Sequence, residues 1–502
     1  MKKCAFISAK NKDGLLEFVM ALSENSYEII ADSDTAVYLR ENGVAVFEIH
    51  NTDFDSNLHK AILVDRSNPD EISSLLEKGI EPVDVVVVNM LNPVNVFGVY
   101  EDFYSVMDNL DFGASSALRS AVKNVNDVVA VTSSADYEIV LSEIRASGEV
   151  SKDTKLALCH KAIDYLCRFD SIISDYMKTK VSTFAYPEIF NSTYDKVSDL
   201  TEEVNSAHTA ALYKSCLSDS MGLCDMKLLC GPSASFNTYR DIDFAVQLLK
   251  EFKGQNAAII SKHSTVCGVA VADELNDAFV KASRTDSISC NGAIIVLGGE
   301  VDKKIALEII KNPYHAVVAL SYEEEALDIC SSKEGLSVFA YDVYASDITE
   351  RKFEVMKIQG GLLMRNVNNI SVTVNESQCV TDIKPDEQQI LDLMFAWKII
   401  RHTKGDSVIV VKDGQTVGVS TGQTNRITAC NNAVSAAGNK SEKAILATNV
   451  SIEHDEVISL CVENKIASII QPGGSAKDEE LISSCNEAEI SMLMTNVKII
   501  NP

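Results

Sequence analysis

The sequence predicts an α/β protein in which a doubly wound parallel sheet at the N-terminus precedes a larger α/β region. Three observations support this fold class. Apolar, strand-like runs alternate with amphipathic, helix-like segments along most of the chain. Residues 83–90 contain a continuous run of valines, of the kind that a parallel sheet buries on both faces. The 502 residues are 46% hydrophobic and 23% charged, which is ordinary for a folded chain of about three domains.

The N-terminal sheet is predicted from its elements in chain order. Apolar residues at helical spacing indicate a helix at 14–23. Lys12, Thr35 and Asn89 lie at or just beyond the ends of predicted strands. In open α/β sheets, ligands bind beyond the carboxyl ends of the strands, which is where these residues lie. The predicted strands are 3–8, 27–31, 44–49, 83–90 and 128–132, and a further helix is predicted at 136–146.

The second region begins after a mainly helical connector at 151–180 and a polar, weakly patterned segment. We therefore expect a domain boundary near 185–200. A hairpin is predicted where strand 407–411 meets strand 416–419 across an Asp-Gly turn. This hairpin has a lysine, a glycine and small residues in the same order as residues 256–272, which suggests an internal duplication. The other predicted elements are strands 293–297, 316–320 and 336–340, and helices 241–252, 301–311, 323–331 and 385–401.

The strongest candidate for chemistry is Lys262-His263, which follows the apolar strand 257–260. Small residues follow the pair, and a helix is predicted at 273–283. The ammonium of Lys262 keeps a neighbouring imidazole near neutrality and binds anions, while His263 moves protons near pH 7. The alternative is an exposed lysine beside a loop histidine, and a two-residue motif does not decide between them.

Two further segments have the composition of an anion site. Ser115 and Ser116 begin a small-residue helix on which Arg119 and Lys123 form an i, i+4 pair that would suit a phosphate. A solvated basic face explains the pair as well. Residues 467–475 form a strand and a glycine loop, either an anion cradle or an ordinary strand–helix turn.

Composition excludes several classes of partner. The formal net charge of −27 repels nucleic-acid phosphates and anionic lipid, although a few cations concentrated in one cleft still suit a small phosphorylated ligand. No apolar run reaches the roughly 20 residues of a membrane span, and the first residues do not form a signal peptide. The thirteen cysteines show no C-x-x-C pair, so we expect a reduced, cytoplasmic protein without a zinc site.

Motifs spread over the whole chain resemble one known family, the bifunctional purine-biosynthesis enzymes that join AICAR transformylase to IMP cyclohydrolase. They occur in the domain order of that family. The C-terminal motifs are F-A-W-K (395–398), K-D-G-Q-T-V-G-V (412–419), G-Q-x-x-R (422–426), Q-P-G-G-S (471–475), G-G-L-L (360–363) and Lys262-His263 before C-G-V-A. The N-terminal motifs are V-V-N (87–89), D-x-G (111–113) and R-S-A-x-K-N (119–124).

The resemblance implies a methylglyoxal-synthase-like cyclohydrolase domain at 1–185. It also implies a transformylase region at 195–502, built from two similar cytidine-deaminase-like subdomains that divide near 370–390. The implied co-substrate is 10-formyltetrahydrofolate, with no metal required, and the implied assembly is a homodimer. The implied reactions convert AICAR to FAICAR and then to IMP.

The resemblance also implies roles for individual residues. His263 corresponds to the proton-transfer residue of formyl transfer and Lys262 to its electrostatic partner, while Lys123 corresponds to the lysine of ring closure. Residues that match substrate-binding positions are Arg426, Asn237, Gly292 and Lys498 in the transformylase region, and Lys12, Thr35, Asn89, Asp111 and Gly113 in the cyclohydrolase domain.

Several motifs depart from the family pattern. Thr201 and Lys498 replace phosphate-binding arginines, and a lysine is a weaker substitute for a bidentate guanidinium. The aromatic folate segment is T-N-V-S-I-E-H-D-E (448–456), K-G-D (404–406) replaces K-S-N, S-N-L-H (56–59) lacks a Lys-Thr, and D-S-D-T (32–35) places carboxylates where a phosphate would rest. Three interpretations stay open: an enzyme with ring closure impaired, a catalytically silent paralogue that binds a purine nucleotide or a partner protein, and a different formyl- or amidine-chemistry enzyme.

Overall fold

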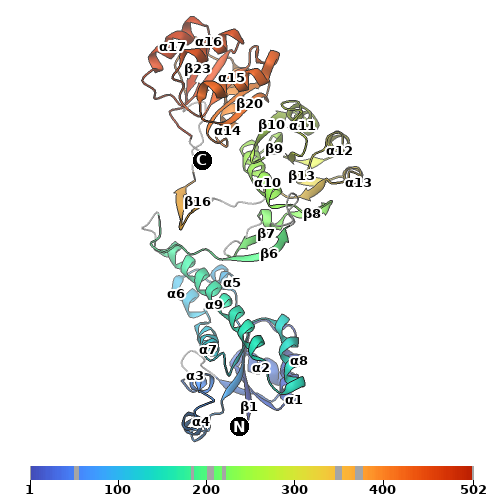
Figure 1. Cartoon of the computed structure of the whole chain (residues 1–502), viewed down its shortest axis with the longest axis vertical. Helices are drawn as coiled ribbons and strands as arrows, with labels where there is room; N and C mark the ends of the chain where they lie inside the picture. The colour runs from blue at the N-terminus through green and yellow to red at the C-terminus, as the bar shows by residue number, and fades with distance from the viewer. Residues whose placement is uncertain are drawn as a thin grey trace. The chain divides into compact units, whose positions relative to one another are not determined.

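The computed structural model of the chain divides into two compact units, Met1–Asp195 with Ser215–Leu217, and Lys196–Lys214 with Ser218–Pro502. Figure 1 shows the elements of both units. The replaced arginine position at Thr201 lies outside the described residues. No helix in the described part of the chain is long and apolar enough to cross a membrane. The structure describes residues 2–49, 56–181, 186–200, 209–216, 222–344, 353–367 and 377–499.

The first unit contains a five-stranded parallel sheet with the order β3-β2-β1-β4-β5. The chain builds outward from β1 to β3 and then returns to the other side of β1 with β4 and β5. The predicted parallel sheet is therefore confirmed, and its strand order reverses between β1 and β4. Its strands are β1 (Lys3–Ala9), β2 (Tyr27–Asp32), β3 (Phe47–Ile49), β4 (Val83–Asn89) and β5 (Val129–Val131).

Helices cover both faces of this sheet, as doubly wound topology requires. Alternate side chains of β1 enter two separate cores, because successive residues of a strand point to opposite faces. Ile7 packs with α1 (Leu15–Glu24), α2 (Ser33–Glu41) and α8 (Tyr137–Ser147). Phe6 packs with α3 (Ser56–Leu63), α7 (Phe112–Lys123) and α9 (Lys152–Lys180). Both side chains are fully buried, which contributes about 1.5–3 kcal/mol each relative to exposure. The remaining helices are α4 (Pro69–Leu76), α5 (Pro93–Val99) and α6 (Phe103–Asp108).

The second unit is organised around one sheet of twelve strands with the order β18-β23-β22-β21-β19-β20-β10-β9-β11-β13-β15-β8. Two antiparallel hairpins, β9–β10 and β19–β20, meet at its centre through β10 and β20. The strands are β8 (Lys227–Cys230), β9 (Asn256–Lys262), β10 (Thr265–Ala272), β11 (Ile294–Leu297), β13 (Ala316–Ala319), β15 (Ser337–Ala340), β18 (Gln378–Cys379), β19 (Asp406–Lys412), β20 (Gln415–Gln423), β21 (Ile445–Thr448), β22 (Ser468–Gln471) and β23 (Ser491–Met494).

The two halves of this sheet repeat one another. In one half, β11 pairs antiparallel with β9, and β13 and β15 continue the sheet in parallel with β11. In the other half, β21 pairs antiparallel with β19, and β22 and β23 continue in parallel with β21. One helix precedes each hairpin, α10 (Phe236–Leu249) and α14 (Glu387–Ile400), and both enter a shared core. The opposite face is covered by α11 (Leu275–Ser283), α12 (Lys303–Ile309) and α13 (Glu324–Ser331) in one half, and by α15 (Arg426–Ala437), α16 (Asp455–Glu463) and α17 (Asp478–Glu487) in the other. The predicted duplication is confirmed.

The small residues after His263 form strand β10, whereas the sequence predicted no strand there. Close contact with α11 explains why residue 268 of this strand is a glycine. A Cβ on Gly268 would lie 2.1 Å from the carbonyl oxygen of Ala282 in α11. Gly418 of β20 has the same relation to Ala433 of α15, at 2.0 Å. Each helix therefore rests backbone to backbone on its strand. Lys262 is the last residue of β9 and His263 lies in the turn of a β-hairpin, so the pair does not lead through a loop directly to a helix.

Candidate active sites

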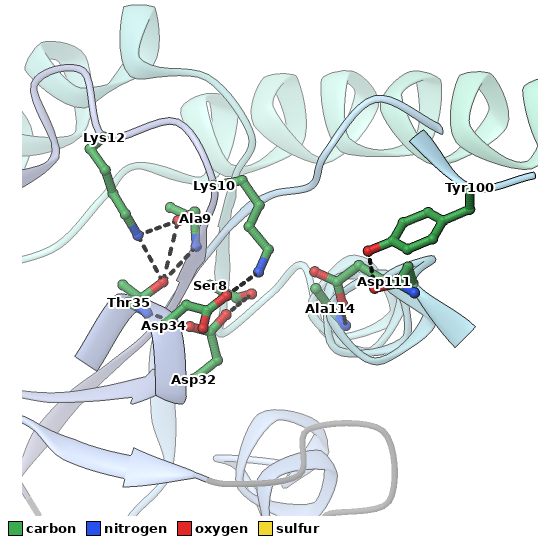
Figure 2. A network of polar contacts seen from close by, with 11 residues as sticks. Ser8, Ala9, Lys10, Lys12, Asp32, Asp34, Thr35, Tyr100, Asp111 and Ala114 are labelled. Carbon is green, nitrogen blue, oxygen red and sulfur yellow. Dashed lines mark hydrogen bonds and ion pairs between the residues drawn. The ribbon is translucent and has the colours of Figure 1, made fainter. Parts of the chain in front are cut away.

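The first candidate site lies where the order of the N-terminal sheet reverses, at the carboxyl ends of β1, β2 and β4. Asp32 caps α2 by accepting the Thr35 N–H at 2.8 Å. This brings the buried Thr35 hydroxyl to the end of β1, where it accepts the Ala9 N–H at 3.1 Å. The Lys12 ammonium donates to the same hydroxyl at 3.2 Å and to the Ala9 carbonyl at 2.5 Å, as Figure 2 shows. Burial lowers the pKa of Lys12.

Asn89 ties the loop after β1 to the end of β4. Its carbonyl accepts the Lys10 N–H at 2.8 Å and its side-chain oxygen accepts the Asn11 N–H at 3.1 Å. The structure therefore brings Lys12, Thr35 and Asn89 together, as their places at strand ends predicted. This is the crevice where open α/β sheets bind ligands.

Asp111 and Gly113 lie at the first turn of α7, on the same side of the sheet. Asp111 caps the helix by accepting the Ala114 N–H at 2.9 Å, and Gly113 is buried. The negative charge of Asp111 helps to raise the pKa of Lys10, and Figure 2 shows both residues in one view. The amide groups at the start of α7 thus lie beside the loop after β1.

Two carboxylates bind a lysine and a hydroxyl group of this crevice. The Lys10 ammonium pairs with Asp34 at 2.6 Å, and the Ser8 hydroxyl donates to Asp32 at 2.5 Å. Burial lowers the pKa of Lys10, but the bond to Asp34 and the charges of Asp34, Asp32 and Asp111 outweigh burial and raise it. The Lys10 bond holds the pKa of Asp34 below its ordinary value. The crevice therefore carries negative charge at neutral pH, which opposes a phosphate.

Lys123 lies away from this group. It is the exposed last residue of α7, about 15 Å along the helix from Gly113 at 1.5 Å per residue. Arg119, its predicted partner in phosphate binding, forms an ion pair with Asp170 of α9. The structure does not bring the Arg119–Lys123 pair to the crevice, because Asp111 and the first turn of α7 lie there whereas Arg119 and Lys123 belong to its last two turns. The role of Lys123 in ring closure stays a prediction.

The second candidate site is the turn of hairpin β9–β10. The Lys262 ammonium donates to the Asn291 carbonyl at 2.5 Å. Gly292 follows with a φ of 73°, and a Cβ on it would lie 3.6 Å from the Lys262 nitrogen. The structure therefore brings Lys262 and Gly292 together, and the exposed imidazole of His263 extends from the same turn.

A buried carboxylate that sequence reasoning missed holds this turn. Asp241 of α10 accepts the N–H of His263 at 2.9 Å and that of Ser264 at 2.6 Å. Asn237 is exposed and lies one helical turn before Asp241, so the two residues share a face of α10. The duplication in the sequence could have indicated this carboxylate. Asp392 on α14 lies at a similar distance before the Asp413–Gly414 turn and accepts the N–H groups of both turn residues.

Arg426 and Lys498 lie in the second half of the repeat. Arg426 begins α15 and pairs with Glu453 at 2.9 Å and with Asp406 at 3.8 Å. The bond from Arg426 lowers the pKa of Glu453, and the charge of Lys498 adds to this effect. Both carboxylates belong to segments that depart from the family pattern. The Lys498 side chain lies beside the glycine loop, because a Cβ on Gly474 would be 3.8 Å from its Cε atom.

The two halves meet close to the His263 turn. The Thr265 hydroxyl, two residues after His263, forms a hydrogen bond of 2.8 Å with the hydroxyl of Thr421 on β20. Because β20 is antiparallel to β10, it ends at the sheet edge where β10 begins, and Arg426 follows it directly. The structure thus places Arg426 at the same end of the paired strands as His263.

The chain is similar to members of one family over its whole length. A model of the family described as AICARFT/IMPCHase bienzyme matches residues 121–436. The bifunctional purine biosynthesis protein PurH of Thermoanaerobacter sp. (strain X514) is 34% identical over 512 residues, with 99% of each chain covered. Proteins of the same name from Ruminiclostridium cellulolyticum and Acetivibrio thermocellus are each 32% identical, with 99% of each chain covered.

Proposed function

The chain belongs to the AICARFT/IMPCHase bienzyme family, and we propose that it transfers the formyl group of 10-formyltetrahydrofolate to the amine of AICAR. The product is FAICAR, an intermediate of purine biosynthesis. The observation that carries the proposal is the end of hairpin β9–β10, where Lys262 is the last residue of β9 and its ammonium binds the Asn291 carbonyl, and where the exposed His263 begins the turn. A cation and a proton acceptor are the two groups that formyl transfer needs.

The chemistry assigns a different task to each residue. The amine nitrogen of AICAR bonds to the formyl carbon while the bond from that carbon to the folate nitrogen breaks. His263 takes the proton that the amine loses, and the departing folate nitrogen receives a proton in return. The Lys262 ammonium stabilises the negative charge that develops on the formyl oxygen. One of its three N–H groups is bound to the Asn291 carbonyl, which leaves two for the substrate.

Substrate binding in this unit is assigned to Arg426, Asn237, Gly292 and Lys498. Arg426 has donors to spare for a substrate, because a guanidinium has five N–H groups and its ion pairs among the described residues are with Glu453 and Asp406. Gly292 leaves room for the Lys262 ammonium. Lys498 supplies a point charge beside the glycine loop, which suits a single anionic oxygen better than a planar anion.

The N-terminal unit is proposed to close the ring of FAICAR to give IMP, and this step is expected to be the weaker one. Lys12, Thr35 and Asn89 support a ligand site at the crevice, and the first turn of α7, with Asp111 and Gly113, supplies amide groups. The carboxylates of Asp34 and Asp32 bind Lys10 and Ser8 there. Negative charge in that position opposes the phosphate of FAICAR or IMP.

A homodimer is proposed from an exposed apolar ribbon in the second unit. Strands β16 (Phe353–Ile358) and β17 (Gly361–Asn366) form a two-stranded ribbon of their own. Its exposed large apolar side chains are Val355, Met356, Ile358, Leu362 and Leu363. A two-stranded ribbon is marginally stable in water, and a second copy of the chain would cover it. Leu363→Ser should shift the species measured by light scattering toward monomer, whereas Leu156→Ser, at another exposed leucine, should not.

A cytoplasmic location without nucleic-acid partners is proposed on composition. All thirteen cysteines are free thiols, which is typical of proteins in a reducing compartment. The net charge of −27 opposes binding to nucleic acid.

The test is an assay of the purified protein with AICAR and 10-formyltetrahydrofolate, in which tetrahydrofolate and IMP are measured separately. Lys262→Ala and His263→Ala should abolish tetrahydrofolate release. Lys412→Ala is the matched control, because Lys412 occupies the equivalent turn and donates to the Glu442 carbonyl at 2.7 Å. Release that survives both site substitutions, or that Lys412→Ala removes equally, contradicts the assignment.

The second candidate function is a catalytically silent member that binds a purine nucleotide or a partner protein. The ion pairs of Arg426 with Glu453 and of Lys10 with Asp34 favour it, since cations needed for substrate are already bound. Binding of AICAR or IMP by calorimetry without any turnover would establish this function. Turnover that requires His263 would exclude it.

A further inference from the structure

His263 and Ser264 adopt a backbone conformation that their side chains disfavour. Their φ angles are 56° and 54°, in the left-handed region that glycine adopts most readily. Such residues cost on the order of 1–3 kcal/mol each and persist where the surroundings over-determine them. The His263 imidazole therefore extends from a turn that needs support from elsewhere in the fold.

Asp241 supplies that support. Asp241 is 9% exposed, and its carboxylate accepts the N–H groups of His263 and Ser264 at 2.9 and 2.6 Å. The Ser264 hydroxyl adds a third contact at 3.3 Å. Hydrogen bonds to a charged acceptor are the stronger kind, so one buried side chain on α10 determines the conformation of the turn.

The duplicated half provides an internal comparison. Asp392 accepts the N–H groups of Asp413 and Gly414 at 2.9 and 2.8 Å. The φ angles of these two residues are 54° and 68°, so the turn is the same. This turn carries no imidazole, and its second residue is the glycine that the conformation favours. The carboxylate clamp is thus common to both halves, and only in the first half does it hold a histidine.

We propose that Asp241 is a positioning residue for formyl transfer, which acts through the backbone of His263 and does not touch substrate. The inference rests on the proposed role of His263. By holding both N–H groups, Asp241 restricts the imidazole to the orientations that a left-handed residue allows. Asp392 performs the same structural task without a part in the reaction.

The experiment compares Asp241→Asn with Asp392→Asn in the full-length protein. An asparagine keeps the shape but directs an N–H group where a second oxygen accepted a bond. Asp241→Asn should lower kcat for tetrahydrofolate release about 10- to 100-fold, with KM for 10-formyltetrahydrofolate changed less than threefold. Asp392→Asn should leave kcat within twofold, although both variants lower the melting temperature to a similar extent.

Rescue separates positioning from general destabilisation. Ser264→Gly in the Asp241→Asn background reproduces the residue found in the second hairpin, because Gly414 occupies the place of Ser264. Glycine adopts the left-handed conformation without strain, so this double variant should recover at least fivefold in kcat. An unchanged kcat in Asp241→Asn, an equal loss in Asp392→Asn, or no recovery in the double variant would overturn the proposal.

A readout without turnover distinguishes this proposal from the proposed function. The NMR signal of the His263 imidazole, in protein labelled at its eight histidines, is assigned with His263→Ala. It should move in Asp241→Asn and stay in place in Asp392→Asn. A signal that stays in place in both refutes the positioning role. A signal that moves, in a protein that never releases tetrahydrofolate, refutes the proposed function and keeps the structural assignment.

Discussion

Asp34→Asn should strengthen binding of IMP to the N-terminal unit. The substitution keeps the shape of the side chain and removes the charge that pairs with the Lys10 ammonium at 2.6 Å. Lys10 would then be free to bind a phosphate oxygen. The same change removes the repulsion between the Asp34 carboxylate and the phosphate.

The magnitude follows from the ion pair. A phosphate oxygen that binds Lys10 at about 2.8 Å would lie about 5 Å from the Asp34 carboxylate. Two unit charges at that separation repel by about 0.8 kcal/mol in water, and a phosphate carries a charge of about −1.5 to −2. The gain is thus about 1–2 kcal/mol, or roughly 5- to 30-fold in affinity, at low ionic strength. At physiological salt, screening should reduce the gain to about threefold.

Calorimetry of IMP binding is the assay, with Asp70→Asn as the control. Asp70 is an exposed carboxylate in the first turn of α4, so its replacement changes the net charge of the unit equally. Because the Lys10 bond lowers the pKa of Asp34, this carboxylate stays charged throughout the neutral range. The gain should therefore be constant above pH 7 and shrink below pH 6, where the phosphate gains a proton. Equal affinities in Asp34→Asn and wild type would refute the reasoning.

Two further predictions concern stability. Gly268→Ala and Gly418→Ala should each lower the free energy of unfolding by about 1–3 kcal/mol, because a Cβ would meet a helix carbonyl. Gly98→Ala is the control, because the added Cβ meets nothing within 4 Å. Melting temperatures of Gly268→Ala and Gly418→Ala equal to that of Gly98→Ala would contradict the packing argument. Burial raises the pKa of Glu251, but the bond from His402 and neighbouring cations lower it overall. Its contribution is present above the unfolded pKa and is lost as pH falls. Glu251→Gln should therefore be less stable than wild type at pH 7 and equal to it near pH 3, as urea titrations would measure.

Local sequence patterns were sufficient to predict most elements of both sheets. The valine run at Val83–Asn89 became the interior strand β4, and both of its faces are buried. The Asp413–Gly414 turn was predicted because both residues favour the left-handed conformation that the hairpin requires. Strand β10 was missed, since glycine and other small residues are as typical of a loop as of a strand that contacts a helix backbone.

The sequence by itself was sufficient to predict most of the strands and helices, to suggest that the second region is duplicated, and to show that Lys262 and His263 are adjacent. These are local properties, because strand and helix propensities depend on residues a few positions apart. Only the tertiary structure decided that Asp241 holds the His263 turn, that Glu453 pairs with Arg426, and that Asp34 pairs with Lys10. The physical reason is distance. Hydrogen bonds and ion pairs act over a few ångströms, and residues separated by 20 or more positions reach that range only after the sheets and helices have packed.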